Sequence, residues 1–161
     1  MKDMPYKKPS WQEKLTDSKD FPRVEQIPSR MCKSWGTGTL VIPAPIEVDE
    51  YMRKVPQGKL TTIGHIRAAL AKKHRTTIGC PLTTGIFASI AAHAAEEQRQ
   101  QGKADVTPYW RTLKTGGLLN EKYPGGLDLQ KLLLEGEGHI VVQKGKKLYV
   151  KDYLKALITL D

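Results

Sequence analysis

Two helix-length patterns joined by a short glycine-containing turn constrain the fold of this chain more than any other feature. Residues 61–75 (TTIGHIRAALAKKHR) place apolar side chains at helical spacing, and one of the two leading threonines is a suitable N-cap. A turn at residues 79–81 leads into a second helix, with Thr83 or Thr84 as its cap. This arrangement predicts a helix-turn-helix, whose second helix enters a nucleic-acid groove.

The second helix carries two different faces. At about 100° per residue, an apolar face that we expect to be the core face comprises Ile86, Phe87, Ile90 and Ala94. A neighbouring stripe carries only small residues, namely Gly85, Ala88, Ser89 and Ala92. Small side chains let the backbone come close either to another helix or to a nucleic-acid groove, and the sequence leaves both interpretations open.

The remaining segments predict a fold of the α/β class that is mostly α. Residues 1–45 are polar and proline-rich and indicate an N-terminal arm, with a short helix near residues 11–15 and a short edge strand at residues 40–42. Further helices are expected at residues 46–55 and from residue 127 to Gly136 or Gly138.

The last part of the chain predicts a β-hairpin and a short final helix. Apolar runs flank a turn at Lys144–Gly145, and Asp152 would cap the helix that follows. Residues 46–161 would therefore form a winged-helix-like DNA-binding domain. The hairpin lysines would either meet phosphates or protect edge strands from aggregation, and they are Lys144, Lys146, Lys147 and Lys151.

The charge of the chain favours double-stranded DNA as a partner. Of its 161 residues, 26 are Lys or Arg and 17 are Asp or Glu, which gives a formal net charge of +9. Such an excess suits a polyanion, although a basic solvated surface has the same composition. No apolar run is long enough to span a bilayer, and the first residues do not resemble a signal peptide, so we expect no membrane association.

No motif in the chain indicates a cofactor or a metal site. A P-loop, a nucleophile elbow and a zinc signature are all absent from the sequence. The two cysteines, Cys32 and Cys80, have no ligand partners nearby and suit a reduced, cytoplasmic setting. Cys80 lies near the predicted start of a helix, where a thiol can become reactive, but a buried inert cysteine is the commoner case.

Three blocks of the sequence, in the same order, resemble the methylated-DNA–protein-cysteine methyltransferases (6-O-alkylguanine-DNA alkyltransferases). Residues 55–70 (VPQGKLTTIGHIRAAL) resemble the entry to the helix-turn-helix of that family, and residues 122–139 (KYPGGLDLQKLLLEGEGH) resemble its "N-Y-x-G-G-L-x-x-K-x-x-L-L-x-x-E-G-H" block. Between them, PYWR at residues 108–111 stands where the family has PCHR. The resemblance covers roughly residues 46–139.

The resemblance places two aromatic residues at the catalytic positions of the family. Tyr109 falls on the alkyl-accepting cysteine, and Trp110 falls on the histidine that activates it. Glu137 matches the glutamate of the same relay. A phenol has a pKa near 10 and no histidine stands beside it, so suicide alkyl transfer at this motif is not expected.

Other motif positions are partly retained. Arg111, Tyr123, Gly125 and Gly126 match the motif arginine, the tyrosine of the lesion-pocket loop and its glycines. Ile63 replaces the tyrosine that rotates the 3′ phosphate, and no arginine stands near Leu82 or Thr83 to fill the gap left by a flipped base. This pattern is most similar to the alkyltransferase-like branch, which lacks the active-site cysteine.

The sequence thus predicts non-catalytic binding of duplex DNA, with recognition of flipped 6-O-alkylguanine in DNA repair and delivery to excision-repair proteins as its most specific form. The predicted DNA-binding residues are Thr83, Thr84, Gly85, Ala88, Ser89, Ala92 and Arg111. The predicted base pocket comprises Tyr109, Trp110, Tyr123, Gly125, Gly126 and Glu137. Two alternatives remain: a methyltransferase-type enzyme that uses Cys80, and a protein-interaction module on a retired repair scaffold.

Overall fold

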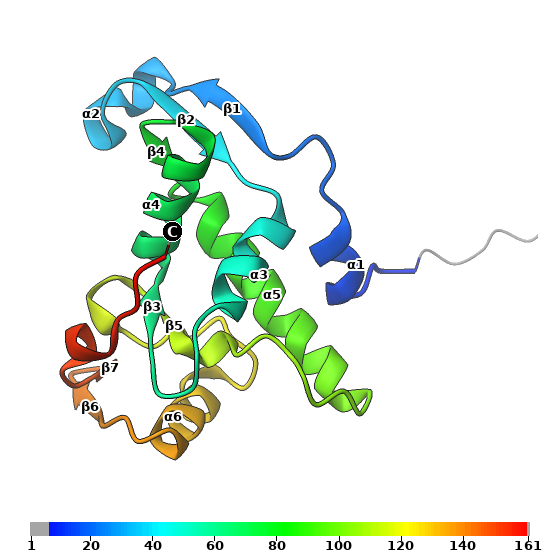
Figure 1. Cartoon of the computed structure of the whole chain (residues 1–161), viewed down its shortest axis with the longest axis vertical. Helices are drawn as coiled ribbons and strands as arrows, with labels where there is room; N and C mark the ends of the chain where they lie inside the picture. Colours follow the sequence, from blue (N-terminus) through cyan, green and yellow to red (C-terminus); the bar gives the residue numbers. More distant parts are fainter. Residues whose placement is uncertain (1–6, 161) are drawn as a thin grey trace, which may run out of the picture.

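A helix-turn-helix lies at the centre of the fold (Figure 1). The computed structural model describes residues 7–160. Helix α4 (Ile63–His74) begins at Thr62, whose side chain accepts a hydrogen bond from the backbone N–H of His65, as the sequence predicts. Helix α5 (Thr83–Gln100) follows after strand β4 (Ile78–Gly79). The predicted helix-turn-helix and α/β class are confirmed.

The start of α5 differs from the prediction. No side chain caps this helix, and Thr84 is fully buried. The Thr84 hydroxyl donates a hydrogen bond to the Cys80 carbonyl oxygen at 2.7 Å, so it secures the turn before the helix instead of capping it. The predicted threonine cap is therefore wrong.

A three-stranded sheet joins the N-terminal segment to this turn. Strand β2 (Thr39–Ile42) pairs antiparallel with β1 (Arg23–Gln26) and parallel with β4, in the order β1-β2-β4. The strand expected at residues 40–42 is thus confirmed, but it lies at the centre of a sheet and not at an edge. Residues 1–6 of the predicted arm lie outside the described residues, and the rest shares this sheet with the helix-turn-helix.

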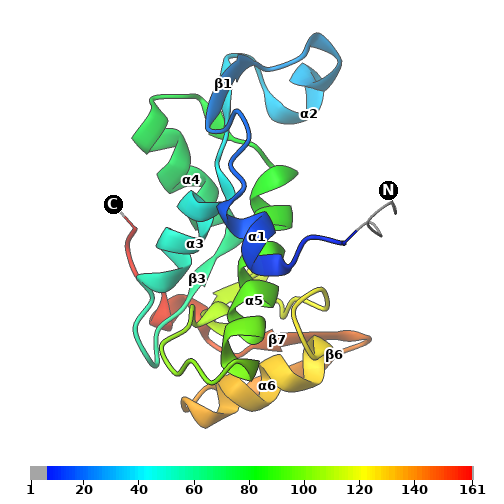
Figure 2. The ribbon, with the colours of Figure 1, turned by 90° about the vertical axis from the view of Figure 1, so that its right-hand side faces the viewer.

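Two helices besides α4 pack against α5. Helix α1 (Trp11–Thr16) and helix α3 (Pro45–Arg53) lie beside it, while the short α2 (Cys32–Trp35) stands beyond the sheet (Figure 2). The core between them is completed from α4 and from the segment that follows α5. Its buried side chains include Val48, Met52, Ile66, Leu70, Phe87, Ala88, Ala91, Ala92, Tyr109 and Tyr123.

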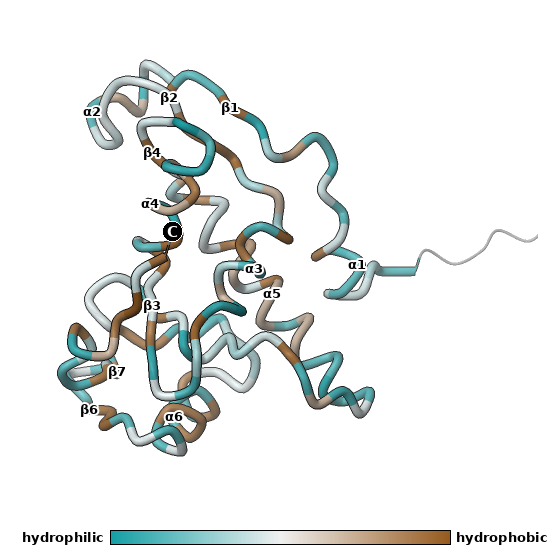
Figure 3. The backbone as a smooth tube through the Cα atoms, in the orientation of Figure 1, coloured by the Kyte–Doolittle hydropathy of each residue, from teal (hydrophilic) through white to brown (hydrophobic). Residues whose placement is uncertain are grey.

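The packed face of α5 combines Phe87 and Ala94 of the predicted core face with Ala88 and Ala92 of the small-residue stripe. Ala88 and Ala92 have no exposed surface, whereas Ile86 is 57% exposed. The interpretation of the small stripe as helix packing is correct for these two alanines, and the placement of Ile86 in the core is wrong. The last turns of α5 and the loop after them are hydrophilic (Figure 3).

The C-terminal part packs beneath the helix-turn-helix. A 3₁₀ turn η2 (Tyr109–Arg111) leads into β5 (Thr112–Leu113), which pairs parallel with β3 (Thr61–Thr62). A second 3₁₀ turn, η3 (Thr115–Gly117), and helix α6 (Gly126–Gly136) follow. A second core of Leu60, Leu113, Leu119, Leu134 and Val150 lies between these elements.

The predicted hairpin is present, and the final helix is shorter than expected. Strands β6 (Val141–Lys144) and β7 (Lys147–Val150) pair antiparallel around a turn at residues 145–146. Only a 3₁₀ turn, η4 (Tyr153–Ala156), follows, and Leu157 then pairs with Leu60 as extended chain. This backbone pairing competes with the helix that the sequence favours. Within the described residues, no helix has the length and apolar character needed to cross a membrane.

Gly79 sets the distance between the sheet and α4. A Cβ built at Gly79 would lie 2.6 Å from the backbone carbonyl oxygen of Arg67. We expect Gly79→Ala to lower the free energy of unfolding by about 1–3 kcal/mol, because backbone must move to admit the methyl group. Gly85→Ala is the matched control, since its Cβ meets nothing within 4 Å and alanine favours a helix. Urea unfolding measures the stability of both variants. Equal free energies of unfolding for Gly79→Ala and Gly85→Ala would contradict this explanation of Gly79.

Candidate nucleic-acid interface

The two tyrosines of the predicted base pocket form a closed aromatic cluster. Tyr109 has no exposed surface and Tyr123 is 2% exposed. The Tyr109 ring meets the rings of Trp110 and Tyr123 edge-on, with centroids 5.4 and 5.5 Å apart. Tyr109 and Tyr123 therefore present no face on which a base could stack.

The two phenols differ in their hydrogen bonding. The Tyr123 hydroxyl donates to the Thr112 carbonyl oxygen at 3.0 Å, and burial raises its pKa. The Tyr109 hydroxyl is buried with no hydrogen-bond partner among the described residues. Burial, and then the nearby carboxylate of Glu96, raise the pKa of Tyr109 to about 12. Neither phenol is ionised near neutral pH.

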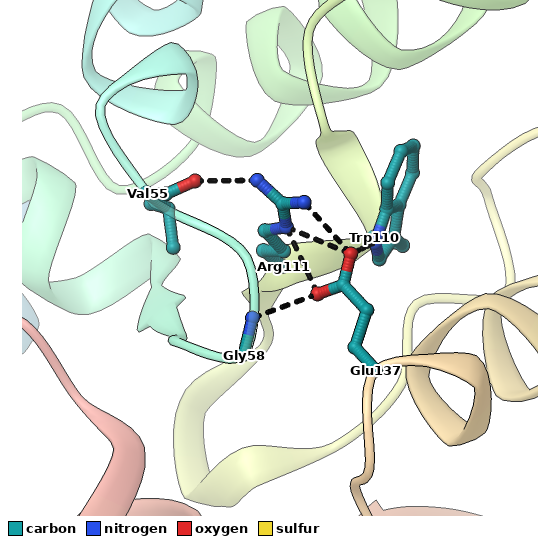
Figure 4. Close-up of polar contacts among 5 residues, drawn as sticks. All are labelled: Val55, Gly58, Trp110, Arg111 and Glu137. Atoms are coloured by element: carbon teal, nitrogen blue, oxygen red, sulfur yellow. Dashed lines mark hydrogen bonds and ion pairs between the residues drawn. The ribbon is translucent and has the colours of Figure 1, made fainter.

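The Glu137 carboxylate lies at the centre of a group of polar contacts that includes Trp110 and Arg111 (Figure 4). It accepts hydrogen bonds from Trp110 Nε1 at 2.9 Å, from Arg111 Nε and Nη2 at 3.0 and 2.7 Å, and from the Gly58 backbone N–H at 3.2 Å. Arg111 Nη1 also donates to the Val55 carbonyl oxygen at 2.8 Å. Burial alone would raise the pKa of Glu137, but hydrogen bonds from Arg111, Trp110 and Gly58 outweigh it and lower the pKa.

Gln130 is a positioning residue that was not predicted from the sequence. Its side chain is fully buried in α6, donates to the Trp110 carbonyl oxygen at 3.2 Å and accepts from the Asn120 backbone N–H at 2.7 Å. The signal for it was a glutamine at helical spacing with Leu127 and Leu134 on an otherwise apolar face.

The predicted base-pocket residues are therefore close together without forming an open pocket. Tyr109, Trp110, Tyr123 and Glu137 pack around η2. Gly125 and Gly126 start α6 with positive φ angles of 75° and 65°, and a Cβ at Gly125 would lie 2.6 Å from Leu129. These glycines allow the tight turn that follows Tyr123 and so let the Tyr123 ring pack against Tyr109.

A groove of about 780 Å³ runs beside α5, and we call it the α5 groove. Helices α1, α4 and α5 and the loop of residues 114–122 form its walls. Its cationic lining residues are Lys14, Arg67, Lys114 and Lys122, and its apolar ones include Trp11, Ile63, Leu82, Ile86 and Ile90. Gly85 and Ser89 line it between these groups. The lining thus combines four cationic side chains with small and apolar groups, and it also contains the acidic residue Glu121.

The predicted DNA-binding residues divide between this groove and the interior. Gly85 and Ser89 lie in the α5 groove. Thr84, Ala88 and Ala92 are fully buried, so in this conformation they are not available to a ligand. Thr83 is half-buried at the start of α5. Arg111 is held by Glu137 and Val55, so its guanidinium supports η2.

Several residues of the α5 groove were not predicted from the sequence. Leu82 and Ile86 are 63% and 57% exposed on α5. Lys114 and Lys122, at the two ends of the loop of residues 114–122, were not among the predicted DNA-binding residues. This loop is fixed on α5, because the Lys122 carbonyl oxygen accepts a hydrogen bond from Ser89 Oγ at 3.3 Å and lies 2.9 Å from His93 Nε2.

The structure also accounts for the basic residues at the end of α4 and for Cys80, because both have contacts within the protein. In the basic run at the end of α4, Lys73 Nζ and His74 Nε2 each lie 2.7 Å from the buried carboxylate of Glu47. Cys80 is 5% exposed and packs with Ile27 and Leu40. Among residues 7–160, no group of three or more His, Cys, Asp or Glu side chains is placed to hold a metal ion.

The fold that carries these features is shared with two solved structures from S. pombe. The structure is similar to that of S. pombe Atl1 in a complex with damaged DNA containing O6-carboxymethylguanine, with 20% identity and a TM-score of 0.52. It is equally similar to S. pombe ATL in a complex with DNA, at 21% identity and a TM-score of 0.52. Each comparison covers 72% of this chain and 94% of the other. No protein-family model and no curated protein matches the sequence.

Replacement of Tyr109 by phenylalanine tests whether its hydroxyl has a role. Because this buried hydroxyl has no hydrogen-bond partner among the described residues, we expect Tyr109→Phe to change the free energy of unfolding by less than about 1 kcal/mol. Tyr123→Phe is the matched comparison, since it removes a hydrogen bond and should cost about 1 kcal/mol. Thermal and urea unfolding of the two variants measure these changes. A larger loss of unfolding free energy for Tyr109→Phe than for Tyr123→Phe would contradict the prediction.

Replacement of Glu137 by glutamine should destabilise the protein by about 3 kcal/mol at pH 7, because it leaves the Arg111 guanidinium without its charge partner. The pKa of Glu137 is lowered in the folded protein, so its stabilising contribution is present above the unfolded pKa of about 4.3 and is lost as the pH falls through the folded pKa. The difference between wild type and variant should therefore narrow below about pH 4.3.

Glu121→Gln is the control for this prediction. Glu121 pairs with Lys114 at 3.3 Å on the surface, where one ion pair contributes less than about 1 kcal/mol. Urea unfolding between pH 3 and pH 7 compares both variants with wild type. A constant difference for Glu137→Gln across this range would contradict the proposed ionisation.

Proposed function

We propose that this chain binds duplex DNA through the α5 groove and acts in DNA repair by recognising alkylated guanine without transferring the alkyl group. The observation that carries the proposal is the cationic groove along α5, in a fold whose solved relatives were crystallised with DNA. The partner of S. pombe Atl1 in its crystal structure is DNA damaged at guanine. Delivery of the bound lesion to excision-repair proteins is the expected outcome of binding without catalysis.

The lining of the α5 groove suits the minor groove of DNA. Arg67, Lys114 and Lys122 would neutralise phosphates, which releases counterions and makes binding dependent on salt. Gly85 and Ser89 would let the backbone of α5 approach the base edges. Leu82 and Ile86 add apolar surface of the kind that minor-groove binders place against base steps.

The chemistry of η2 favours binding over alkyl transfer. Alkyl transfer needs a nucleophile that is ionised and accessible. Tyr109 has no exposed surface and its pKa is about 12, so its phenol meets neither condition. Cys80, the alternative nucleophile, is packed with Ile27 and Leu40 in a separate apolar cluster.

Recognition of a flipped base would require a local opening. In the closed state, Tyr109 has no exposed surface and its ring lies edge-on against the ring of Tyr123. We propose that an alkylated base is admitted when the segment of residues 122–126 moves away from α5. The Lys122 carbonyl contacts with Ser89 and His93 would break in this step.

Titration of duplexes with and without 6-O-methylguanine tests this function by gel shift. We expect the wild-type chain to bind both duplexes at low salt and the modified one more tightly. Ile86→Glu should weaken binding at least about tenfold, because it puts a negative charge in the groove facing phosphates. Leu132→Glu is the matched control, since Leu132 is 66% exposed on α6, and it should bind like wild type.

Each outcome of this titration bears on a different part of the proposal. Absence of binding to either duplex at low salt would refute DNA binding, and the exposed apolar pair Leu82 and Ile86 would then favour the protein-interaction alternative. Equal affinity for the two duplexes would refute lesion recognition alone. An increase in intact protein mass after incubation with alkylated DNA would refute binding without alkyl transfer.

A further inference from the structure

The tip of the β6–β7 hairpin carries several lysines close together, and none of them has an acidic partner in the described part of the chain. Lys144, Lys146 and Lys147 are exposed and surround the turn, and Lys151 follows β7. Their ammonium groups form no ion pair within residues 7–160. From residue 140 to residue 152, the only acidic side chain is that of Asp152.

The position of these lysines argues against a purely protective role. Lysines that discourage edge-to-edge pairing are effective along the free edges of strands. Here Lys144 ends β6 and Lys147 begins β7, so with Lys146 they gather at the turn. The turn is fixed by Gly145, which adopts a φ of 62°. The three lysine charges are therefore presented together at the tip of an ordered hairpin.

The hairpin is joined to the loop that forms one wall of the α5 groove. The Leu119 backbone N–H donates to the Leu148 carbonyl oxygen at 3.0 Å, and Leu118 pairs with Tyr149. Val150, at the other end of β7, is buried in the second core. These contacts place the hairpin below the loop of residues 114–122 and fix it there (Figure 2).

The α5 groove and the hairpin are connected through a stretch of surface that contains Lys114 and its ion-pair partner Glu121. A shallow groove of about 280 Å³ lies between the loop and the hairpin, and its lining includes Lys114, Glu121, Lys146 and Lys147. Lys114 and Glu121 also line the α5 groove. A duplex held along α5 would therefore meet the hairpin lysines on the same side of the molecule.

We propose that the hairpin tip binds the phosphate backbone of the same duplex, outside the segment held by α5, and that it contributes affinity without discriminating between lesion and normal DNA. This inference rests on the proposed function. Strands of four residues extend about 13 Å, which corresponds to about four base pairs along B-form DNA. The contacts are to phosphates, so they depend strongly on salt and not on base identity.

The experiment measures the dissociation constant for unmodified and 6-O-methylguanine duplexes over a range of KCl concentrations. We expect the triple variant K144Q/K146Q/K147Q to lower the slope of log affinity against log salt by about 2 to 3, since each phosphate contact contributes about 0.9. The ratio of affinities for the two duplexes should stay at the wild-type value. The triple arginine variant at the same positions should keep the wild-type slope.

K33Q/K54Q/K103Q is the matched control. It removes the same charge from exposed lysines that do not line either groove, and its slope should equal that of wild type. An unchanged slope in the hairpin variant, or an equal drop in this control, would overturn the hairpin proposal while DNA binding through α5 stands. A loss of slope confined to Ile86→Glu would overturn the hairpin proposal in the same way. Absence of DNA binding by the wild-type chain would overturn both proposals.

Discussion

The carboxylate of Glu137 connects three segments that are distant in the sequence. It accepts hydrogen bonds from Gly58, before β3, and from Trp110 and Arg111, in η2, and it lies at the end of α6. A carboxylate removed from water costs several kcal/mol unless such donors surround it. Each segment therefore depends on the others, and the parallel pairing of β3 with β5 follows from the same contacts.

The consequence is a closed turn at residues 108–111, where the sequence resemblance places the alkyl-accepting position of the alkyltransferases. Glu137 binds the side chains of η2, and Gln130 donates a hydrogen bond to the Trp110 carbonyl oxygen in the same turn. The turn held in this way directs Tyr109 into the core between α5 and Tyr123. The available polar and cationic surface then lies beside α5, in the groove with Arg67, Lys114 and Lys122. The site that we propose for DNA is thus defined by the outer face of the helix-turn-helix and not by the motif that reveals the resemblance.

The spacing of apolar residues predicted the ranges of the helices well. It predicted poorly which side chains of a helix are exposed. The ranges of α4, α5, α6 and the hairpin follow from apolar spacing and turn residues. Ile86 shows the limit, because apolar spacing placed it in the core and it is 57% exposed, while Ala88 and Ala92 of the neighbouring stripe are buried. The central place of β2 depends on pairing with β4, nearly forty residues later, and no local pattern encodes such a contact.

The candidate site was predictable only where a motif fixed residue identity. The convergence of Tyr109, Trp110, Tyr123 and Glu137 follows from the resemblance. The closure of that cluster does not, because it depends on side-chain volume in the folded core. Lys114 and Lys122 carried no local signal, and they became groove residues only through the contacts of the Lys122 carbonyl with Ser89 and His93.

At the position where the resemblance places the relay glutamate, Glu137 accepts a hydrogen bond from the indole Nε1–H of Trp110 at 2.9 Å. An indole offers the carboxylate a donor as an imidazole would, but it cannot accept or release a proton near neutral pH. The hydrogen bond is therefore compatible with a structural role and not with a proton relay. A buried glutamate with three donor residues therefore stabilises the turn through its ion pair and hydrogen bonds.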